Sequence, residues 1–211
     1  MTTTEAPELR VDAQNNRNRI LDVARDTFAA RGLDAPMAAI ARRAGVGVAT
    51  LYRRFPTKES LIAEAFADKI EQCTSVIDDG LADPDPWHGF CMVVEQVCAM
   101  QAVDRGLTAA LVTTFPDVSA FDAMRLKAER GFEVLAQRAK DAGRLRQDFE
   151  FDDLTMVLMA NGGLITTSTE AALAASRRLV AFLLQSFRAD RAEPLPPSTP
   201  LGLDNVIPRP Q

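Results

Sequence analysis

An all-α fold is what the sequence predicts, and three observations point to it. Apolar residues recur every three or four positions through nine successive segments, which is the period of one helix face. No stretch of useful length alternates apolar and polar residues as a half-buried strand does. Glycine, proline and aspartate clusters interrupt the pattern at short intervals, as is typical of helices joined by turns. We therefore expect about nine helices.

The first four expected helices include two very short ones. Gly32 and Gly45 end the first and the second helix, and Pro56 stops the third. Thr57 is the expected N-cap of the fourth helix, with Ser60 three residues later where a full capping box would have an acid. A flexible tail is expected over residues 1–12. The expected helices cover residues 16–31, 36–44, 48–55 and 58–77.

The remaining expected helices are longer and more apolar. A turn over residues 83–86, with the sequence Asp-Pro-Asp-Pro, separates them from the first four. The pair Gly162 and Gly163 should loosen or kink the helix that contains it. The proline-rich residues 189–211 are expected to form an extended tail. These expected helices cover residues 87–102, 108–114, 118–140, 152–167 and 170–188.

The composition is that of an ordinary globular protein. Hydrophobic residues make up 47% and charged residues 25% of the 211 positions, enough for one or two small domains. No apolar run is long enough to span a membrane. The polar first residues lack the apolar stretch of a secretory signal, so we expect a cytoplasmic protein with reduced thiols.

The sequence lacks the residues and motifs that most metal sites and enzymes need. The chain has one histidine, His88, and three cysteines without CxxC spacing, so we expect no metal site and no cofactor. It has no nucleophile elbow, phosphate loop or HExxH motif, and we expect no enzymatic activity. Cys91 and Cys98 lie seven residues apart on one helix face. Core packing is the expected role for both, with a thiol-reactive sensor as the alternative.

Residues 13–60 have the pattern of a helix-turn-helix. Two short helices are joined at Gly45 and flanked by longer ones, and Ile40, Val46 and Leu51 can form the small core that fixes their crossing. This stretch carries a formal charge of +5, and the rest of the chain carries −10. A basic unit on an acidic body suits local contact with phosphates, although a solvated helix face would have the same charge.

The second short helix would enter the major groove of DNA. Hydroxyl groups on it can bond to phosphates, and its arginines can neutralise phosphates or pair with guanine. Arg17 and Arg19 are further candidates, as an arm that reaches the DNA backbone or the minor groove. The expected DNA contacts are Val48, Ala49, Thr50, Tyr52, Arg53 and Arg54, with Lys58, Arg42 and Arg43 beside them.

Residues 20–66 closely resemble the DNA-binding domain of the TetR family of bacterial transcription regulators. The motifs IARRAGV, ATLYRRF and TKESL occur in order and at the family's spacing. Five residues at three places depart from the family's pattern. Pro36 and Met37 replace the usual threonine entry, Gly47 replaces a serine or threonine, and Arg53 with Arg54 replaces a frequent aromatic–histidine pair. These changes keep the fold but leave the operator sequence unpredictable.

The resemblance implies a DNA-binding domain over residues 13–60 and a ligand-binding and dimerisation domain over residues 61–188. It also implies a homodimeric repressor that a small, largely apolar effector releases from an inverted-repeat operator. The alternatives are a ligand-independent architectural DNA-binding protein and an activator. Tilting of the helix at 58–77 would change the separation of the two recognition helices, which must be about 34–36 Å apart.

Two sets of residues in the second domain are assigned to these roles. Apolar side chains with a few polar neighbours can line an adaptable pocket. The last two helices offer more apolar surface than one small domain needs, which is typical of a dimer seam. Expected ligand contacts are Phe90, Val94, Cys98, Thr113, Thr114, Met124, Met156 and Asn161. Expected dimer contacts are Leu154, Val157, Leu158, Leu179, Leu183 and Phe187.

Overall fold

The computed structural model describes the backbone of residues 5–104, 107, 119–164, 166–191 and 193–197. Eight of the nine expected helices lie in that part of the chain, and no named strand does, so the predicted all-α class is confirmed. None of the helices described is both long enough and apolar enough to cross a membrane. The helices are α1 (Glu5–Arg31), α2 (Met37–Arg43), α3 (Val48–Arg54), α4 (Lys58–Ala82), α5 (Pro86–Val103), α7 (Ser119–Asp141), α8 (Phe151–Gly162) and α9 (Thr169–Ser186).

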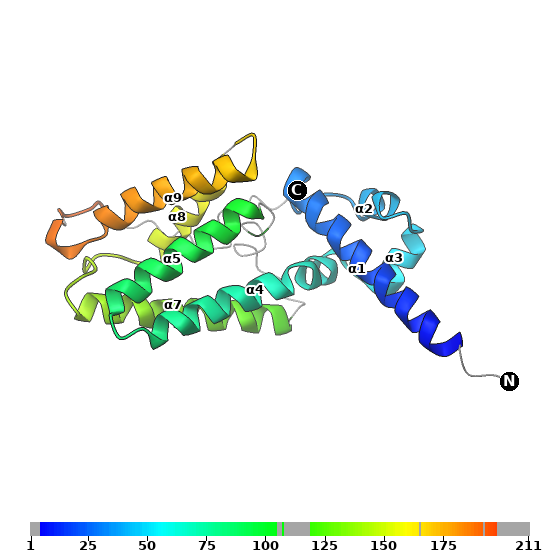
Figure 1. Cartoon of the computed structure of the whole chain (residues 1–211), viewed down its shortest axis with the longest axis horizontal. Helices are drawn as coiled ribbons and strands as arrows, with labels where there is room; N and C mark the ends of the chain where they lie inside the picture. Colours follow the sequence, from blue (N-terminus) through cyan, green and yellow to red (C-terminus); the bar gives the residue numbers. More distant parts are fainter. Residues whose placement is uncertain (1–4, 105–106, 108–118, 165, 192, 198–211) are drawn as a thin grey trace.

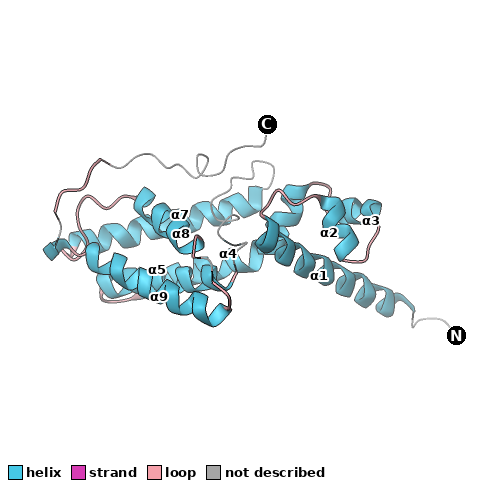
Figure 2. Ribbon diagram, turned by 90° about the horizontal axis from the view of Figure 1, so that it is seen from above, coloured by secondary structure: helices cyan, strands magenta, loops and turns pink. Residues whose placement is uncertain are grey.

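The molecule has two parts joined by α4 (Figure 1). The head consists of α1, α2, α3 and the first half of α4, and the body consists of the rest of α4 with α5, α7, α8 and α9. Both views place the head at one end, with α1 extending away from the body toward the N-terminus (Figure 2).

Three helix boundaries differ from expectation by several residues. Helix α4 continues to Ala82, although the sequence predicted an end at residue 77. Helix α1 begins at Glu5, so the flexible tail expected over residues 1–12 is wrong for residues 5–12. The segment contains good helix formers, and Pro7 lies in the first turn, where a missing N–H costs nothing. Helix α8 ends at Gly162 with Gly163 as its C-cap, so this glycine pair terminates the helix instead of kinking it. The helix expected at 108–114 lies outside the described residues.

The head is held by a small core between α1, α2, α3 and α4. Phe28 of α1 and Phe66 of α4 pack with ring centroids 6.3 Å apart. Leu51 anchors α3 and is 0% exposed. Gly45 turns the chain from α2 to α3 with a φ of +66°, a conformation that favours glycine. The amide of Val46 then donates to the carbonyl of Ala41 at 3.0 Å, which closes the end of α2.

Helix α4 belongs to both parts of the molecule. The hydroxyl of Thr57 accepts from the amide of Ser60 at 3.0 Å, and the hydroxyl of Ser60 accepts from the amide of Thr57 at 3.2 Å. Ser60 therefore completes the capping box without the acid that the sequence lacks. Along the helix, Phe66 and Ile70 pack in the core of the head, whereas Cys73 and Ile77 pack in the core of the body.

The body depends on a close crossing of α4 and α5. A Cβ atom at Gly89 would lie 2.4 Å from the carbonyl oxygen of Gly80, closer than real Cβ contacts allow. A cluster of phenylalanines fills the space beyond this crossing. Phe90 packs against Phe132 at 5.5 Å and against Phe149 at 5.4 Å between ring centroids.

Candidate functional site

Helix α3 presents an outward face that the described part of the chain leaves exposed. Val48 is 42% and Tyr52 46% exposed, although both are large apolar or aromatic side chains. Ala49 and Arg53 are also exposed, and Thr50 and Arg54 are half-buried. Because Leu51 and Phe55 are buried on the opposite side, α3 is fixed to the head while this face points to solvent. DNA contact by these residues stays a prediction.

The other expected DNA contacts surround α3 in different environments. Arg42 is exposed at the end of α2, and Lys58 is half-buried at the start of α4. Arg43 contacts α1, with a guanidinium nitrogen 3.8 Å from a carboxylate oxygen of Asp26 and another donating to the hydroxyl of Thr27 at 3.5 Å. Its side chain therefore has partners within the head.

Arg17 is not placed as the arm that the sequence suggested. Its guanidinium donates to both carboxylate oxygens of Glu64 at 2.5 Å and lies 4.9 Å from the centroid of the Phe55 ring. These contacts join α1, α4 and the end of α3. They connect residues 47 positions apart, which no local pattern in one sequence reveals.

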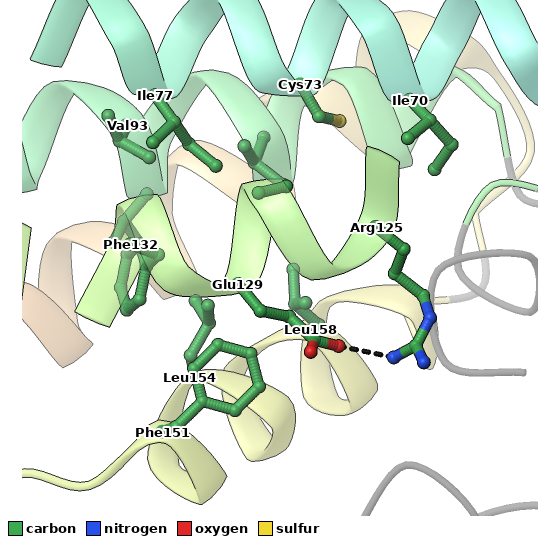
Figure 3. A pocket seen from close by; sticks show the side chains of 13 residues that line it. Ile70, Cys73, Ile77, Val93, Arg125, Glu129, Phe132, Phe151, Leu154 and Leu158 are labelled. Atoms are coloured by element: carbon green, nitrogen blue, oxygen red, sulfur yellow. Dashed lines mark hydrogen bonds and ion pairs between the residues drawn. The ribbon is translucent and has the colours of Figure 1, made fainter. Parts of the chain in front are cut away.

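The body contains a cavity of about 70 Å³ between α4, α5, α7 and α8. Figure 3 shows side chains from α4, α5, α7 and α8 around it. Its wall is apolar over most of its extent and includes Ile70 and Ile77 from α4, Val94 from α5 and Phe132 from α7. Ile70 also packs in the core of the head, so one α4 side chain contacts both the cavity and the head.

The expected ligand contacts are dispersed around this cavity. Val94 lines it. Phe90 and Cys98 are fully buried in the core of the body outside the lining, and Met124 is half-buried against the core of the head. Met156 is 47% exposed on α8, because its position faces away from the body. Thr113 and Thr114 lie outside the described residues.

Asn161 belongs to a buried polar cluster between α5, α8 and α9. Its amide nitrogen donates to the carbonyl of Cys98 at 2.9 Å and to the side-chain oxygen of Gln101 at 2.7 Å. Gln101 in turn donates to the carbonyl of Leu158 at 3.0 Å, and Ser176 donates to that of Cys98 at 3.3 Å. Asn161 therefore joins α8 to α5, and Ser176 connects α9 to the same carbonyl group.

Two charged residues of α7 complete the cavity wall, and the sequence did not single them out. Arg125, 8% exposed, donates through Nη1 to Oε1 of Glu129 one turn later. Burial raises the pKa of Glu129, and the nearby Arg125 opposes that shift. A pair at i and i+4 on a helix is usually a solvated surface pair, so the pattern gave no signal of a cavity.

The expected dimer contacts divide between buried and half-buried positions. Leu154, Val157 and Leu158 of α8 are buried inside their own chain, and Leu154 and Leu158 line the cavity. Leu179, Leu183 and Phe187 are half-buried. The same two helices instead expose Met156, Met159 and Phe182, of which Phe182 is 57% exposed. Helical spacing identified apolar faces but not which of them turns inward.

The environments of two cysteines and of the histidine favour structural roles. Burial raises the pKa of Cys91 and of Cys98 to about 12, so both thiols stay protonated and a thiolate-based sensor is disfavoured. His88 is exposed, with Nδ1 2.6 Å from a carboxylate oxygen of Asp83. Within the described ranges, no three histidine, cysteine or carboxylate side chains lie close enough to hold a metal ion.

Two family models match the chain. The model of bacterial regulatory proteins of the TetR family matches residues 20–65, and that of the SbtR-like transcriptional regulator C-terminal domain matches residues 85–189. The TetR transcription regulatory protein from Mycobacterium vanbaalenii is 33% identical, with 85% of this chain and 99% of that chain covered and a TM-score of 0.46.

Two further relatives are more limited in what they share. The HTH-type transcriptional repressor KstR from Rhodococcus jostii (strain RHA1) is 34% identical over 113 residues, 51% of each protein. The chain spans about half the length of the curated relatives it matches. A bacterial regulatory protein in the tetR family from Rhodococcus RHA1 is 18% identical with a TM-score of 0.63 over 82% of this chain and 96% of that one, which shows a common fold.

Proposed function

Since the chain belongs to the TetR family of bacterial regulatory proteins, we propose that it is a DNA-binding transcriptional repressor of the cytoplasm. It binds an inverted-repeat operator as a homodimer, and a small apolar effector releases it. The observation that carries this proposal is the outward face of α3, with Tyr52 and Arg53 exposed on a helix anchored by Leu51. Repression, as opposed to activation, is supported by the curated relatives, which are transcriptional repressors.

The reading of DNA follows from the shape and charge of α3. A helix of seven residues fits the major groove with its side chains against base edges. Arg53 can bond with guanine or a phosphate, and the exposed methyl groups of Val48 can contact thymine. Lys58 and Arg42 beside the helix can hold the phosphate backbone, which fixes the register of the head on the duplex.

Dimerisation places two such helices on one face of the DNA. The side chains of Met156 and Met159 on α8 and of Phe182 on α9 are exposed, and we propose that they contribute to the dimer contact. A two-fold axis through this contact would relate two heads. Their α3 helices must be about 34–36 Å apart to enter successive major grooves.

Release by an effector depends on α4, because this helix packs in both the head and the body. Ile70, Cys73 and Ile77 line the cavity, and the same helix continues into the core of the head. A molecule that enlarges the cavity would displace α4 and with it the head. A coupling free energy of roughly 1–3 kcal/mol changes operator affinity about 5–150-fold, which is sufficient for regulation.

The test is DNA binding by the full chain to the region upstream of its own gene. We expect sequence-specific binding whose affinity falls steeply with salt, because phosphate contacts release counterions. A scrambled duplex of the same composition is the control. Equal affinity for both duplexes would contradict the proposal and favour an architectural DNA-binding protein.

A further inference from the structure

Two charged residues border the cavity at one end. Its apolar wall comes from α4, α5, α8 and part of α7, and Arg125 and Glu129 of α7 complete it. In Figure 3 the two side chains extend next to each other and are joined by their hydrogen bond, beside Leu158. The surface that the cavity exposes is apolar, and the charged groups of Arg125 and Glu129 lie behind it at this one end.

Arg125 has a donor to spare. Its Nη1 donates to Glu129, and its Nε lies 3.6 Å from Oδ1 of Asp122, too far for a hydrogen bond. This Nε is buried and has no hydrogen-bond acceptor among the residues that the structure describes. A buried N–H without an acceptor is unfavourable, so an oxygen atom brought close to it gains a hydrogen bond that no described residue supplies.

The charges around Arg125 limit which polar group of a ligand can bind there. Asp122 and Glu129 both lie close to Arg125, so the three groups together carry a formal charge of −1 when both acids are ionised. A carboxylate on the ligand would add a third negative charge in a partly desolvated site. The two acids would attract an ammonium group, but it has no acceptor for the Nε proton and would also be repelled by the guanidinium. A ketone, ester or hydroxyl oxygen accepts from Arg125 without either cost.

We propose that the effector is an uncharged molecule, apolar over most of its length, whose single oxygen acceptor binds the guanidinium of Arg125. Glu129 holds that guanidinium in place by occupying Nη1. That this ligand regulates DNA binding rests on the proposed function. The chemistry of the ligand follows from the cavity alone and does not depend on DNA.

The test uses three probes of six carbons that differ only in the polar end: hexan-2-one, hexanoate and hexylammonium. A cavity of about 70 Å³ favours probes this short. Affinities are measured for the full chain by nuclear magnetic resonance titration. We expect hexan-2-one to bind most tightly. Hexanoate or hexylammonium binding more tightly than hexan-2-one would overturn the proposal without any variant.

Variants on α7 locate the hydrogen bond. Arg125→Met keeps an unbranched side chain and removes the donor, and we expect hexan-2-one to bind about tenfold more weakly, the loss of one hydrogen bond to a charged donor. Arg130→Met removes an exposed arginine from the same helix and is the matched control, with affinity unchanged. Equal affinity of wild type and a folded Arg125→Met for hexan-2-one would overturn the assignment.

A second variant covers the case in which Arg125→Met does not fold. Glu129→Gln keeps an oxygen acceptor for Nη1 but removes one negative charge, so it should reduce the preference for hexan-2-one over hexanoate. An unchanged preference would contradict the electrostatic argument. Release of operator DNA by hexan-2-one is measured separately. If hexan-2-one binds in a way that depends on Arg125 but does not release operator DNA, the proposed regulation is contradicted and the proposed ligand chemistry is still supported.

Discussion

The arginines beside α3 in the head and the two buried arginines of the body have opposite environments. In the head, Arg42 and Arg53 are exposed at the ends of α2 and α3. In the body, Arg125 and Arg146 are 8% and 5% exposed, and each binds a carboxylate of its own chain. An exposed arginine can exchange water for a phosphate or a base, whereas a buried and paired one can only contact what enters the protein.

The difference shows how one chain can hold two kinds of site. The head fixes α3 with side chains that are almost fully buried, such as Leu51 and Phe55, so its outer face is a rigid surface. The body retains an apolar cavity beside a helix that it shares with the head. The rigid head suits recognition of a partner of fixed shape, and the cavity of the body suits a response to a ligand. The predictions below test that division, from the largest expected effect to the smallest.

Leu51→Ala should break the head and spare the body. The substitution removes the buried anchor of α3, and we expect the head to lose about 2–5 kcal/mol of unfolding free energy and operator binding with it. Val48→Ala, on the exposed side of the same helix, is the matched control and should change stability by less than about 0.5 kcal/mol. Urea unfolding followed by circular dichroism measures both. Equal stability of the two variants would mean that α3 is not held by its buried face.

Gly89→Ala should destabilise the body and spare the head. Its Cβ atom would collide with the backbone of Gly80 across the α4–α5 crossing, and such overpacking costs about 1–3 kcal/mol. Gly163→Ala is the control, since its Cβ atom would meet no heavy atom closer than 3.4 Å. The measurement is again unfolding by urea. A Gly89→Ala protein as stable as Gly163→Ala would show that the two helices cross less closely than described.

Arg53→Ala should affect DNA binding without affecting either core. If Arg53 contacts a base, specific binding weakens by roughly 1–3 kcal/mol and discrimination at one base pair relaxes. If affinity falls equally for every sequence, Arg53 contacts only a phosphate. Arg130→Ala on α7, exposed but far along the chain from α3, is the control for the general effect of one lost charge. Gel-shift titrations with operator variants decide between these outcomes, and unchanged affinity for all duplexes would exclude both.

The smallest effect concerns the exposed pair of His88 and Asp83. The hydrogen bond that the protonated imidazole of His88 donates to the carboxylate of Asp83 raises the pKa of His88 above its ordinary value of 6.5. Its contribution to stability is therefore fully present below pH 6.5 and is lost as pH rises through the raised pKa. Wild type should lose slightly more stability than His88→Gln over that range, as thermal unfolding in matched buffers would show. Parallel pH profiles would mean that the pair does not persist in solution.

The sequence predicted the head better than the body because its signals are local. Gly45 at a turn, Leu51 on the buried side of α3 and a hydroxyl N-cap at Thr57 each act within a few residues. Glu5 to Asp12 were misassigned because their polar character suggested a tail, although the residues are compatible with a helix.

The body depends on contacts between residues far apart in the sequence. Leu158 and Met156 lie two positions apart on α8, yet the first lines the cavity and the second is exposed. Spacing alone could not say which apolar face turns inward. Arg125 was missed for a related reason. A charged residue one turn from an acid predicts an exposed helix face, and only the positions of the neighbouring helices show that it is buried.

The most direct test of the central claim is a hydroxyl-radical footprint of the full chain on the DNA upstream of its gene, for wild type and Arg53→Ala. Two exposed α3 helices in a symmetric dimer predict two protected half-sites whose centres are separated by about 34–36 Å or a multiple of it, with protection weakened by Arg53→Ala. Protection of one site by a single chain, or a footprint that Arg53→Ala leaves unchanged, would contradict the claim.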